Sequence, residues 1–537
     1  MRVQEETQQI ITEPSAGGAA GAAPAGLCSA TRWRNNANQI SYPRWTHIRD
    51  DDRHSILCLR AGADVKIAVP VEPANIDGCN TTVNGINTIV KENIVETLTV
   101  LDPNDSKVLP RLATKWEDQG NGTWRISLRE GVGFHDGKPF NADAVVKAIT
   151  RMQSTGVTCL DRTKIANVKL TATAVDDKTV DIHADPAQVL MPVFLSFMGI
   201  TGPDTSPTEL SRAPVGTGPF QFVSWDGDGV KLKRNDNYWG KKPEVENATY
   251  VFRGESALRA AMVKTGEADI AFAIAPQDAD DPKMDKAFLN GETTRIRFVM
   301  QPPLDDIRIR QALNLGLDRQ ALIGTVLSDK VVPATQFILP KINGYNPDLK
   351  VWPYDPDKAA ALVAEAKAAG VPVDKPIRLI GRTNFFANEP ELLEATQQMW
   401  QAIGLNVKVE MMESAEWLKL VNKPYPADRT AMMIQEMHDN NNGDAAFTMY
   451  FRYHSKGQQS EMNNPQVDGL IDKAMAETGE QRTKDFQEAN RIIADEVIPA
   501  VPQYHMVSQM RVGPRVNYEP NGLSTVQFEL SDITLNK

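Results

Sequence analysis

Hydrophobic and polar residues alternate along residues 123–129, as they do in a half-buried β-strand. Trp124, Ile126 and Leu128 fall on one face of this strand, and hydroxyl or charged residues fall on the other. The strand follows Asn121-Gly122, a dipeptide that favours tight hairpin turns because glycine accepts a positive φ. The pattern therefore predicts a β-hairpin that bends at residues 121 and 122.

The same alternation returns on both sides of Asp176-Asp177, and it predicts a second hairpin there. A further strand is predicted to begin at Asp64, where a polar stretch gives way to "VKIAVPV".

Three other stretches are typical of helices: residues 141–152, 355–370 and 391–403. In the first, apolar residues recur at i, i+4 and i+7 behind Asn141, which stands where an N-cap is expected. The second begins with Asp355 and Pro356 and ends at Gly370. The third stops at Gly404, and a strand is predicted after it.

Strands and helices intermingle from Asp64 onward, which favours an α/β fold. Because 537 residues exceed what one hydrophobic core supports, several domains are expected. Residues 1–62 contain "SAGGAAGAAPAG" and predict a low-complexity, disordered or non-native N-terminal segment. Ala61-Gly62-Ala63 has the small-x-small form of a signal-peptidase site, although no apolar signal-peptide core precedes it.

The charge balance narrows the function classes. The chain has 58 basic and 69 acidic residues, for a net charge of −11. Nucleic-acid binding needs a concentrated basic surface, so this composition argues against it. No run of about 18 apolar residues exists, so no transmembrane helix is predicted. The four cysteines form no CxxC pair, which argues against a zinc or redox motif and suits an exported protein with one or two disulfides.

His135-Asp136-Gly137 is the stretch that most suggests chemistry. A hydrolase using His135 and Asp136 would also need a nucleophile, and the sequence has no GxSxG elbow. Asp-Gly is a preferred turn dipeptide, so the stretch is interpreted as a structural turn before Pro139.

The region around this turn resembles the family 5 extracellular solute-binding proteins of bacterial ABC importers. The resemblance begins with "GFHDGKPFNADAVVKAI" and continues in order through "GTGPF", "NDNYWGKKPE", "KTGEADIAF" and "DDIRIRQAL". It covers about residues 64–537. It implies an α/β, two-lobed periplasmic-binding-protein-like fold with an extra subdomain in the first lobe and a hinge between the lobes.

The resemblance also implies a domain plan. Residues 63–274 plus 498–537 would form the first lobe, with an inserted subdomain at about 106–213, and residues 275–497 would form the second lobe. Cys79 and Cys159 both fall in the expected first lobe, whereas the other two cysteines fall in the N-terminal segment. One disulfide between Cys79 and Cys159 is therefore predicted.

The function that the resemblance implies is a periplasmic solute receptor. It would bind a peptide or peptide-like compound between its lobes and deliver it, as a monomer, to ABC permease subunits, with no cofactor or metal. A non-peptide solute such as an opine or oligosaccharide is the alternative, and a scaffold or chaperone sharing the fold is a third possibility.

In peptide-binding relatives, an aspartate of the second lobe pairs with the ligand's amino terminus. The corresponding segment here departs from the family pattern and offers Asp444 and Asp439 as carboxylates, with Asn441 between them. A calcium loop fits this run poorly because Gly443 falls one place early. An asparagine-rich surface turn also explains it.

Arg382 and Phe385 form the second candidate. Arg382 ends a predicted strand, and loops after strands in open α/β sheets face the cleft. Its guanidinium could hold a carboxylate, and Phe385 could cover apolar ligand surface. The alternative places Arg382 in a surface ion pair and the phenylalanine in the lobe core.

Overall fold

The computed structural model describes residues 63–83, 85–104, 106–165, 168–383, 385–439, 443–522 and 527–536. The expected N-terminal segment, residues 1–62, lies outside the described residues. No helix within the described ranges is both long enough and apolar enough to span a bilayer.

The strands are β1 (Asp64–Val69), β2 (Thr99–Leu101), β3 (Val108–Pro110), β4 (Ala113–Gly120), β5 (Thr123–Leu128), β6 (Lys169–Asp176), β7 (Thr179–Asp185), β8 (Phe220–Asp226), β9 (Gly229–Arg234), β10 (Asn247–Phe252), β11 (Ile270–Ala271), β12 (Asp285–Phe298), β13 (Val332–Pro333), β14 (Ile377–Arg382), β15 (Val407–Met412), β16 (Met432–Asp439), β17 (Ala500–Val512), β18 (Val516–Asn517) and β19 (Thr534–Leu535).

The α-helices are α1 (Asn87–Val90), α2 (Ala142–Gln153), α3 (Met191–Phe194), α4 (Ser256–Lys264), α5 (Ile307–Leu315), α6 (Arg319–Leu322), α7 (Pro356–Ala368), α8 (Glu389–Ala402), α9 (Ser414–Val421), α10 (Ala446–Tyr453), α11 (Pro465–Ala476) and α12 (Gly479–Ile492).

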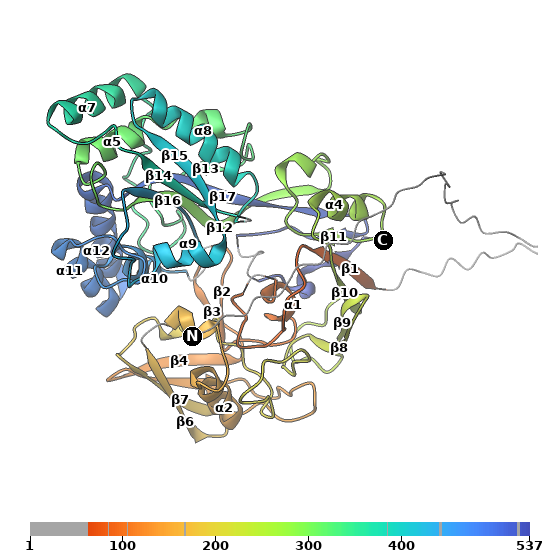
Figure 1. The fold of residues 1–537 in the computed structure, drawn as a ribbon. Helices are drawn as coiled ribbons and strands as arrows, with labels where there is room; N and C mark the ends of the chain where they lie inside the picture. Colours follow the sequence, from red (N-terminus) through yellow and green to blue (C-terminus); the bar gives the residue numbers. More distant parts are fainter. Residues whose placement is uncertain are drawn as a thin grey trace, which may run out of the picture. The chain divides into compact units, whose positions relative to one another are not determined.

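One 11-stranded sheet runs through both lobes, in the order β15-β14-β16-β12-β17-β11-β1-β10-β9-β8, with β13 paired to β17 (Figure 1). The strands β14–β16 belong to the second lobe, and β1 and β8–β11 belong to the first. The two long strands β12 and β17 pair with each other and join the lobes. The α/β, two-lobed prediction is confirmed.

The second lobe packs helices onto a partly parallel sheet, because β14 pairs in parallel with both β15 and β16. Figure 1 shows α5, α7 and α8 beside these strands. Trp400 of α8 is fully buried, and its indole N–H donates to the Leu313 carbonyl at 2.9 Å, so this large side chain leaves no polar group unpaired. The predicted cap of α7 is confirmed, since the Asp355 side chain accepts from the Lys358 amide at 3.0 Å.

The first lobe centres on β1, which pairs in parallel with β10 and β11. Phe528, Leu530 and Ile533, near the end of the chain, are fully buried in the same core as Ile67 and Tyr250. The last segment therefore folds back onto first-lobe strands. The exact domain boundaries expected from the sequence stay predictions.

A separate four-stranded sheet, in the order β4-β5-β7-β6, packs against α2 and forms the extra subdomain. Both predicted hairpins are present: β4 turns into β5, and β6 turns into β7. Asn121 and Gly122 adopt φ values of 51° and 75°, as the first turn requires. A Cβ on Gly122 would lie 2.6 Å from the Ala184 carbonyl oxygen, so glycine is needed for this approach as well.

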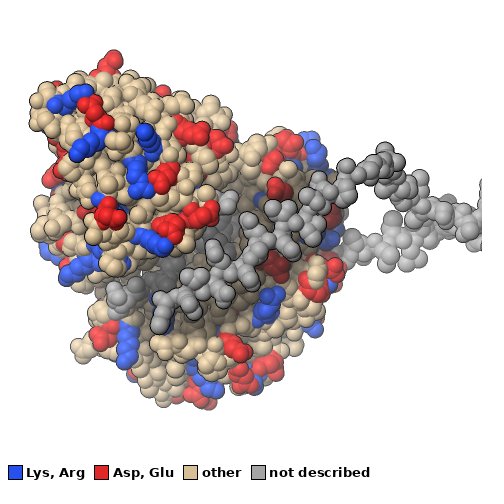
Figure 2. Space-filling model, in the orientation of Figure 1, with Lys and Arg blue, Asp and Glu red and all other residues tan. Residues whose placement is uncertain are grey.

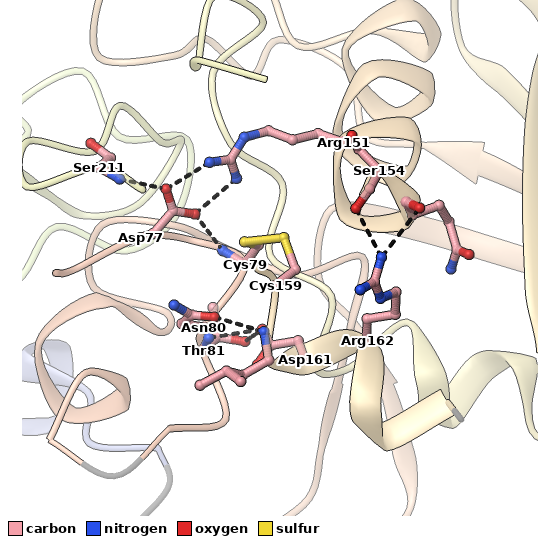
Figure 3. Close-up of a disulfide and its surroundings, with 12 residues drawn as sticks. Asp77, Cys79, Asn80, Thr81, Arg151, Ser154, Cys159, Asp161, Arg162 and Ser211 are labelled. Carbon is pink, nitrogen blue, oxygen red and sulfur yellow. Dashed lines mark hydrogen bonds and ion pairs between the residues drawn. A yellow bond between two sulfur atoms is a disulfide. The ribbon is translucent and has the colours of Figure 1, made fainter. Parts of the chain in front are cut away.

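The predicted disulfide between Cys79 and Cys159 is confirmed (Figure 3). Beside it, the Asp77 carboxylate accepts two bonds from the Arg151 guanidinium, at 2.9 and 2.8 Å. The buried Asp161 carboxylate accepts from the backbone and hydroxyl groups of two threonines, at positions 81 and 82. Covalent and polar links therefore fasten the loop at residues 77–82 to the subdomain.

The two strands that join the lobes do not pair evenly. Their register shifts between Leu289 and Thr293 and again between Thr293 and Arg295. Gly291, inside this interval, has a φ of 80°. Asn290 donates to the Ser508 hydroxyl across the strands, at 3.0 Å. A bulge of this kind bends a strand locally, so residues 290–293 mark a bending point between the lobes.

Candidate functional site

A cavity of about 630 Å³ lies along this bending point. Its walls come from the segments that follow β1 and β11, from the middle of β12, β16 and β17, and from residues 385–387 after β14. The residues at the bulge therefore also line the cavity. Small-molecule sites of proteins are commonly clefts of about 300–1,000 Å³, so the size suits a small solute.

Most of the cavity wall is apolar. Three methionines contribute from strands of the central sheet, Met437 from β16 and Met506 and Met510 from β17, and several phenylalanines complete the surface. Methionine is flexible and polarizable, so it adapts to ligands of different shape.

Two lining side chains of the described wall are charged, Arg259 and Glu292. Arg259 is buried, and its guanidinium donates to the backbone carbonyls of residues 253, 254, 272 and 273. These bonds connect Arg259 of α4 to the backbone just before this helix and just after β11. Glu292 is half-buried and lies one residue after Gly291, on the β12 part of the wall.

Arg382 and Phe385 lie together at one side of this cavity. Phe385 lines it, and the Arg382 guanidinium carbon lies 3.4 Å from the centre of the Phe385 ring. Trp417, the indole of α9, stands 5.0 Å from the same carbon. Burial lowers the pKa of Arg382, while the charges of Glu389 and Glu292 oppose that shift. Arg382 is therefore a half-buried cation directly behind the aromatic wall.

Glu389, the first residue of α8, accepts a bond from the Arg382 backbone amide at 3.0 Å. Burial raises the pKa of Glu389 to about 7, although this bond and the Arg382 charge oppose the shift. Glu389 thus fixes the end of β14 and the position from which Arg382 extends.

Asp444 is engaged within the protein. It is 7% exposed, and its carboxylate pairs with Arg482 at 2.6 Å, accepts from the Asn343 side chain at 2.9 Å and caps the Ala446 amide at 2.8 Å. These contacts give no support to the expectation that Asp444 pairs with a ligand ammonium.

The neighbouring candidates are placed only in part. Asp439 ends β16 and stands opposite Glu292 in the pairing of β16 with β12. Asn441 lies outside the described residues. Both stay predictions. Among the described residues, no three histidine, cysteine, aspartate or glutamate side chains gather as metal ligands do.

The stretch His135-Asp136-Gly137 is a turn, as interpreted from the sequence. The Gly137 amide donates to the Phe134 carbonyl at 2.9 Å, and Gly137 has a φ of 85°. The His135 ring lies 2.9 Å from the Gly218 carbonyl, and burial lowers its pKa. The His135 ring therefore links this turn to Gly218 of the "GTGPF" motif. Asp136 lies at the surface of the turn.

Acidic and basic side chains are interspersed on the face of the molecule drawn in Figure 2. The electrostatic potential at a bound solute is therefore determined mainly by the charged groups in and behind the cavity wall. Salt screens these partly buried groups less than it screens exposed surface charges.

The two-lobed fold, with strands crossing between the lobes and a cavity beside the crossing, defines a solute-binding protein of the periplasmic type. The sequence model of the family described as "Bacterial extracellular solute-binding proteins, family 5 Middle" matches residues 107–460, which is more than half of the chain. This chain belongs to that family. Its members bind peptides and related solutes for import by ABC transporters, and they are periplasmic or extracellular binding proteins.

Among its relatives is the dipeptide-binding protein of Escherichia coli (strain K12), which is 26% identical over 437 residues, covering 74% of this chain and 80% of that protein. The glutathione-binding protein GsiB of Shigella flexneri is 31% identical over 379 residues, covering 67% of this chain and 71% of that protein. The solved structure of HbpA2 from Haemophilus parasuis superimposes with a TM-score of 0.77 at 21% identity, covering 88% of this chain and 100% of that one. At this identity, the last similarity establishes the fold alone.

The sequence patterns did not single out Glu292 or the methionines that line the cavity. A signal for Glu292 was present, because Asn290-Gly291 interrupts an alternating strand and an internal glycine often marks a bulge. No comparable signal distinguishes Met437 or Met506 from ordinary core methionines.

Proposed function

We propose that this receptor binds a small peptide-like solute with apolar side chains in the 630 Å³ cavity and delivers it to an ABC permease. The observation that carries the proposal is the wall itself, which is apolar over most of its area and carries one carboxylate, Glu292, on a crossing strand. Burying apolar solute surface there contributes roughly 25 cal/mol per Å².

The polar groups support a solute with two opposite charges. Glu292 would pair with an ammonium, and Arg382, which lies behind Phe385 and not in the wall, would attract a carboxylate through its charge. The pKa of Arg382 responds to the Glu292 charge, so the two groups lie within electrostatic reach of each other. Leaving either solute charge unpaired inside the cavity would cost several kcal/mol.

The choice of a peptide-like solute over an oligosaccharide also rests on the wall. Sugars present many hydroxyl groups that need hydrogen-bonding partners, and this wall is apolar over most of its area although hydroxyl and amide side chains stand in it. The two relatives named for their solutes bind a dipeptide and glutathione, both of which carry an ammonium and a carboxylate. Asp439 and Asn441 remain proposed contacts at the end of β16.

The proposal places the receptor in the periplasm as a monomer. The disulfide between Cys79 and Cys159 supports export, because disulfides persist in oxidising compartments. The proposed role is binding without chemical change of the solute. We also propose that residues 63–274 plus 498–537 and residues 275–497 move as the two lobes, with the subdomain at about 106–213 carried by the first.

The location of the site is tested by filling the cavity from its rim. Val71 lines the cavity and is 65% exposed, so Val71→Trp adds bulk inside the cavity at little cost to folding. We expect it to weaken binding of the dipeptide Leu-Phe by at least about tenfold, or 1.4 kcal/mol. Val223→Trp is the matched control, because Val223 is 51% exposed on the edge strand β8. Isothermal calorimetry on both variants decides the point, and unchanged affinity in Val71→Trp would place the site elsewhere.

The role of Glu292 is tested with a pair of solutes that differ in one charge. The wild-type protein should bind Leu-Phe about 30-fold more tightly than N-acetyl-Leu-Phe, the lower end of what a buried charge pair contributes. Glu292→Gln should reduce that preference to within about threefold, and Glu292→Asp should retain most of it. Glu267→Gln, at an exposed carboxylate, is the control. A preference that survives in Glu292→Gln would assign the ammonium to another group.

A further inference from the structure

The lobes touch at a second place besides the crossing strands. Gly443, just after β16 in the second lobe, lies against the β2–β3 hairpin of the first. A Cβ on Gly443 would lie 3.1 Å from the Ser106 carbonyl oxygen and 3.2 Å from its Cβ. We infer that this Ser106–Gly443 contact is the closing contact of the receptor, the point at which the two lobes meet when they enclose a solute.

Both sides of the contact are held rigidly by their own cores. The hairpin is flanked by Leu98 and Leu112, which are fully buried in the subdomain core. On the other side, Ala445 and Ala446 are buried in a second-lobe core with Phe486. The two surfaces therefore approach as preformed bodies.

Asp444 is the positioning residue of this contact. It follows Gly443 directly, and its ion pair with Arg482 and its bond from Asn343 fix the backbone at residues 443–446. An isolated bridge also pairs the backbone of residues 343 and 444. The carboxylate that the sequence suggested for the solute thus acts on the shape of the cleft's edge.

Backbone conformation on both sides suits a close approach. Gly443 has a φ of 70°, and Ser106 has a φ of 58°, which is unusual for a residue with a side chain. Leu190 of the subdomain also packs against the second-lobe core that contains Ala445. The meeting surface is small and made of side-chain and backbone packing, so closure about the bulged strands can make and break it.

Cross-linking tests the contact without any solute. The distance between the Ser106 Cβ and an ideal Cβ at residue 443 is 3.2 Å, close to the roughly 3.5–4.5 Å of disulfides. In a background with Cys28→Ser and Cys58→Ser, the pair Ser106→Cys with Gly443→Cys should form a second disulfide under mild oxidation. The pair Ser106→Cys with Gly479→Cys is the control. Thiol counting reads the result, and a yield no higher than in the control overturns the contact.

The effect on binding is tested with two matched glycines. Gly443 and Gly479 both have a φ of 70°, but nothing lies within 4 Å of a Cβ on Gly479. Gly443→Ala and Gly479→Ala should therefore lose similar melting temperature through the same backbone strain. Only Gly443→Ala should open the lobes, seen as a larger radius of gyration by X-ray scattering. It should also weaken Leu-Phe binding about three- to tenfold, because the closed form becomes less populated.

The binding comparison of Gly443→Ala with Gly479→Ala rests on the proposed function, whereas the cross-linking experiment does not. Equal affinity and equal radius of gyration in the two alanine variants would overturn the closing role, even if the cross-link forms. Failure of the wild-type protein to bind Leu-Phe or any other apolar dipeptide would instead overturn the peptide-like function, and the cross-link and radius of gyration would still decide the contact.

Discussion

Each lobe contains an ion cluster, and the two clusters have opposite compositions. In the first lobe, the Arg111 guanidinium forms ion pairs with three carboxylates, those of Glu92 at 2.8 Å, Glu96 at 3.1 Å and Glu529 at 2.9 Å. The second lobe reverses the arrangement. There the Glu436 carboxylate forms ion pairs with three guanidiniums.

These guanidiniums belong to Arg295, Arg297 and Arg452, whose nitrogens lie 2.8, 3.0 and 3.2 Å from Glu436 oxygens. All three arginines are buried. Arg295 also lies over the ring of Phe337, with its guanidinium carbon 4.2 Å from the ring centre. An aromatic face thus offsets part of the excess positive charge.

The two clusters differ in whether their excess charged groups can change protonation state. A carboxylate can neutralise itself by taking up a proton, whereas a guanidinium keeps its charge at every ordinary pH. Burial raises the pKa of Glu92 to about 7, despite the opposing charge of Arg111. Burial acts in the same direction on Glu436, but the three guanidiniums overcome it and lower that pKa to about 2. The acid-rich cluster can lose charge by taking up a proton, whereas in the arginine-rich cluster three guanidiniums share the Glu436 carboxylate and Arg297 also pairs with Glu461.

The largest effect is expected from removing that carboxylate. Glu436→Gln removes the anion shared by three buried guanidiniums, of which Arg297 keeps an ion pair with Glu461 at 3.3 Å. Breaking buried pairs in this way costs about 3–5 kcal/mol. We expect a loss of this size in the free energy of unfolding, measured by urea denaturation at pH 7.

Glu410→Gln provides the matched control. Glu410 pairs with Arg378 at 2.8 Å, but both side chains are partly exposed, and such pairs contribute about 0–1 kcal/mol. A loss in Glu436→Gln no greater than in Glu410→Gln would contradict the idea that the second-lobe cluster depends on the carboxylate that its three guanidiniums share.

A smaller effect, with a defined pH dependence, is expected in the first lobe. Because the folded protein raises the pKa of Glu92 from 4.5 to about 7, the folded state binds a proton that the unfolded state has lost over that interval. The contribution of Glu92 to stability is therefore complete below pH 4.5 and declines as the pH rises towards 7. The total is about 3 kcal/mol. Glu92→Gln, which stays neutral, should remove this decline from the stability profile between pH 4.5 and 8.

Glu436 has the opposite dependence, since its stabilisation is complete above pH 4.5 and is lost as the pH falls towards 2. The comparison therefore predicts that Glu92→Gln changes the neutral limb of the profile and leaves the acid limb in place. Glu117→Gln, an exposed carboxylate on β4, should change neither limb. An unaltered neutral limb in Glu92→Gln would show that Glu92 is ionised throughout.

Local features of the fold were predictable because their causes are local. Asn121-Gly122 specifies its turn within two residues, and Asp355 caps α7 through an amide three residues away. The subdomain hairpins and α8 followed from the same kind of signal. The disulfide followed from the family resemblance together with the location of the other two cysteines.

The candidate site was less predictable because its interactions join distant residues. The role of Asp444 as a ligand carboxylate stays a prediction, and its ion pair with Arg482, 38 residues further on, has no local signal in the sequence. Glu292 is a polar position on a strand in the sequence, and its place in the cavity wall, beside the register shift with β17, depends on how distant strands pair. Phe385 and Arg382 were found together because a strand end and its loop are close in sequence.

The disulfide between Cys79 and Cys159 makes residues 79–159 a closed covalent ring. That ring contains β2–β5 and α2, and therefore the hairpin that meets Gly443. A protease that cuts once inside the ring, for example after Lys107, leaves every residue attached to the same molecule. Such a nicked receptor migrates as one species until a reductant separates its fragments, so a preparation can contain cleaved chains that only a reducing gel reveals.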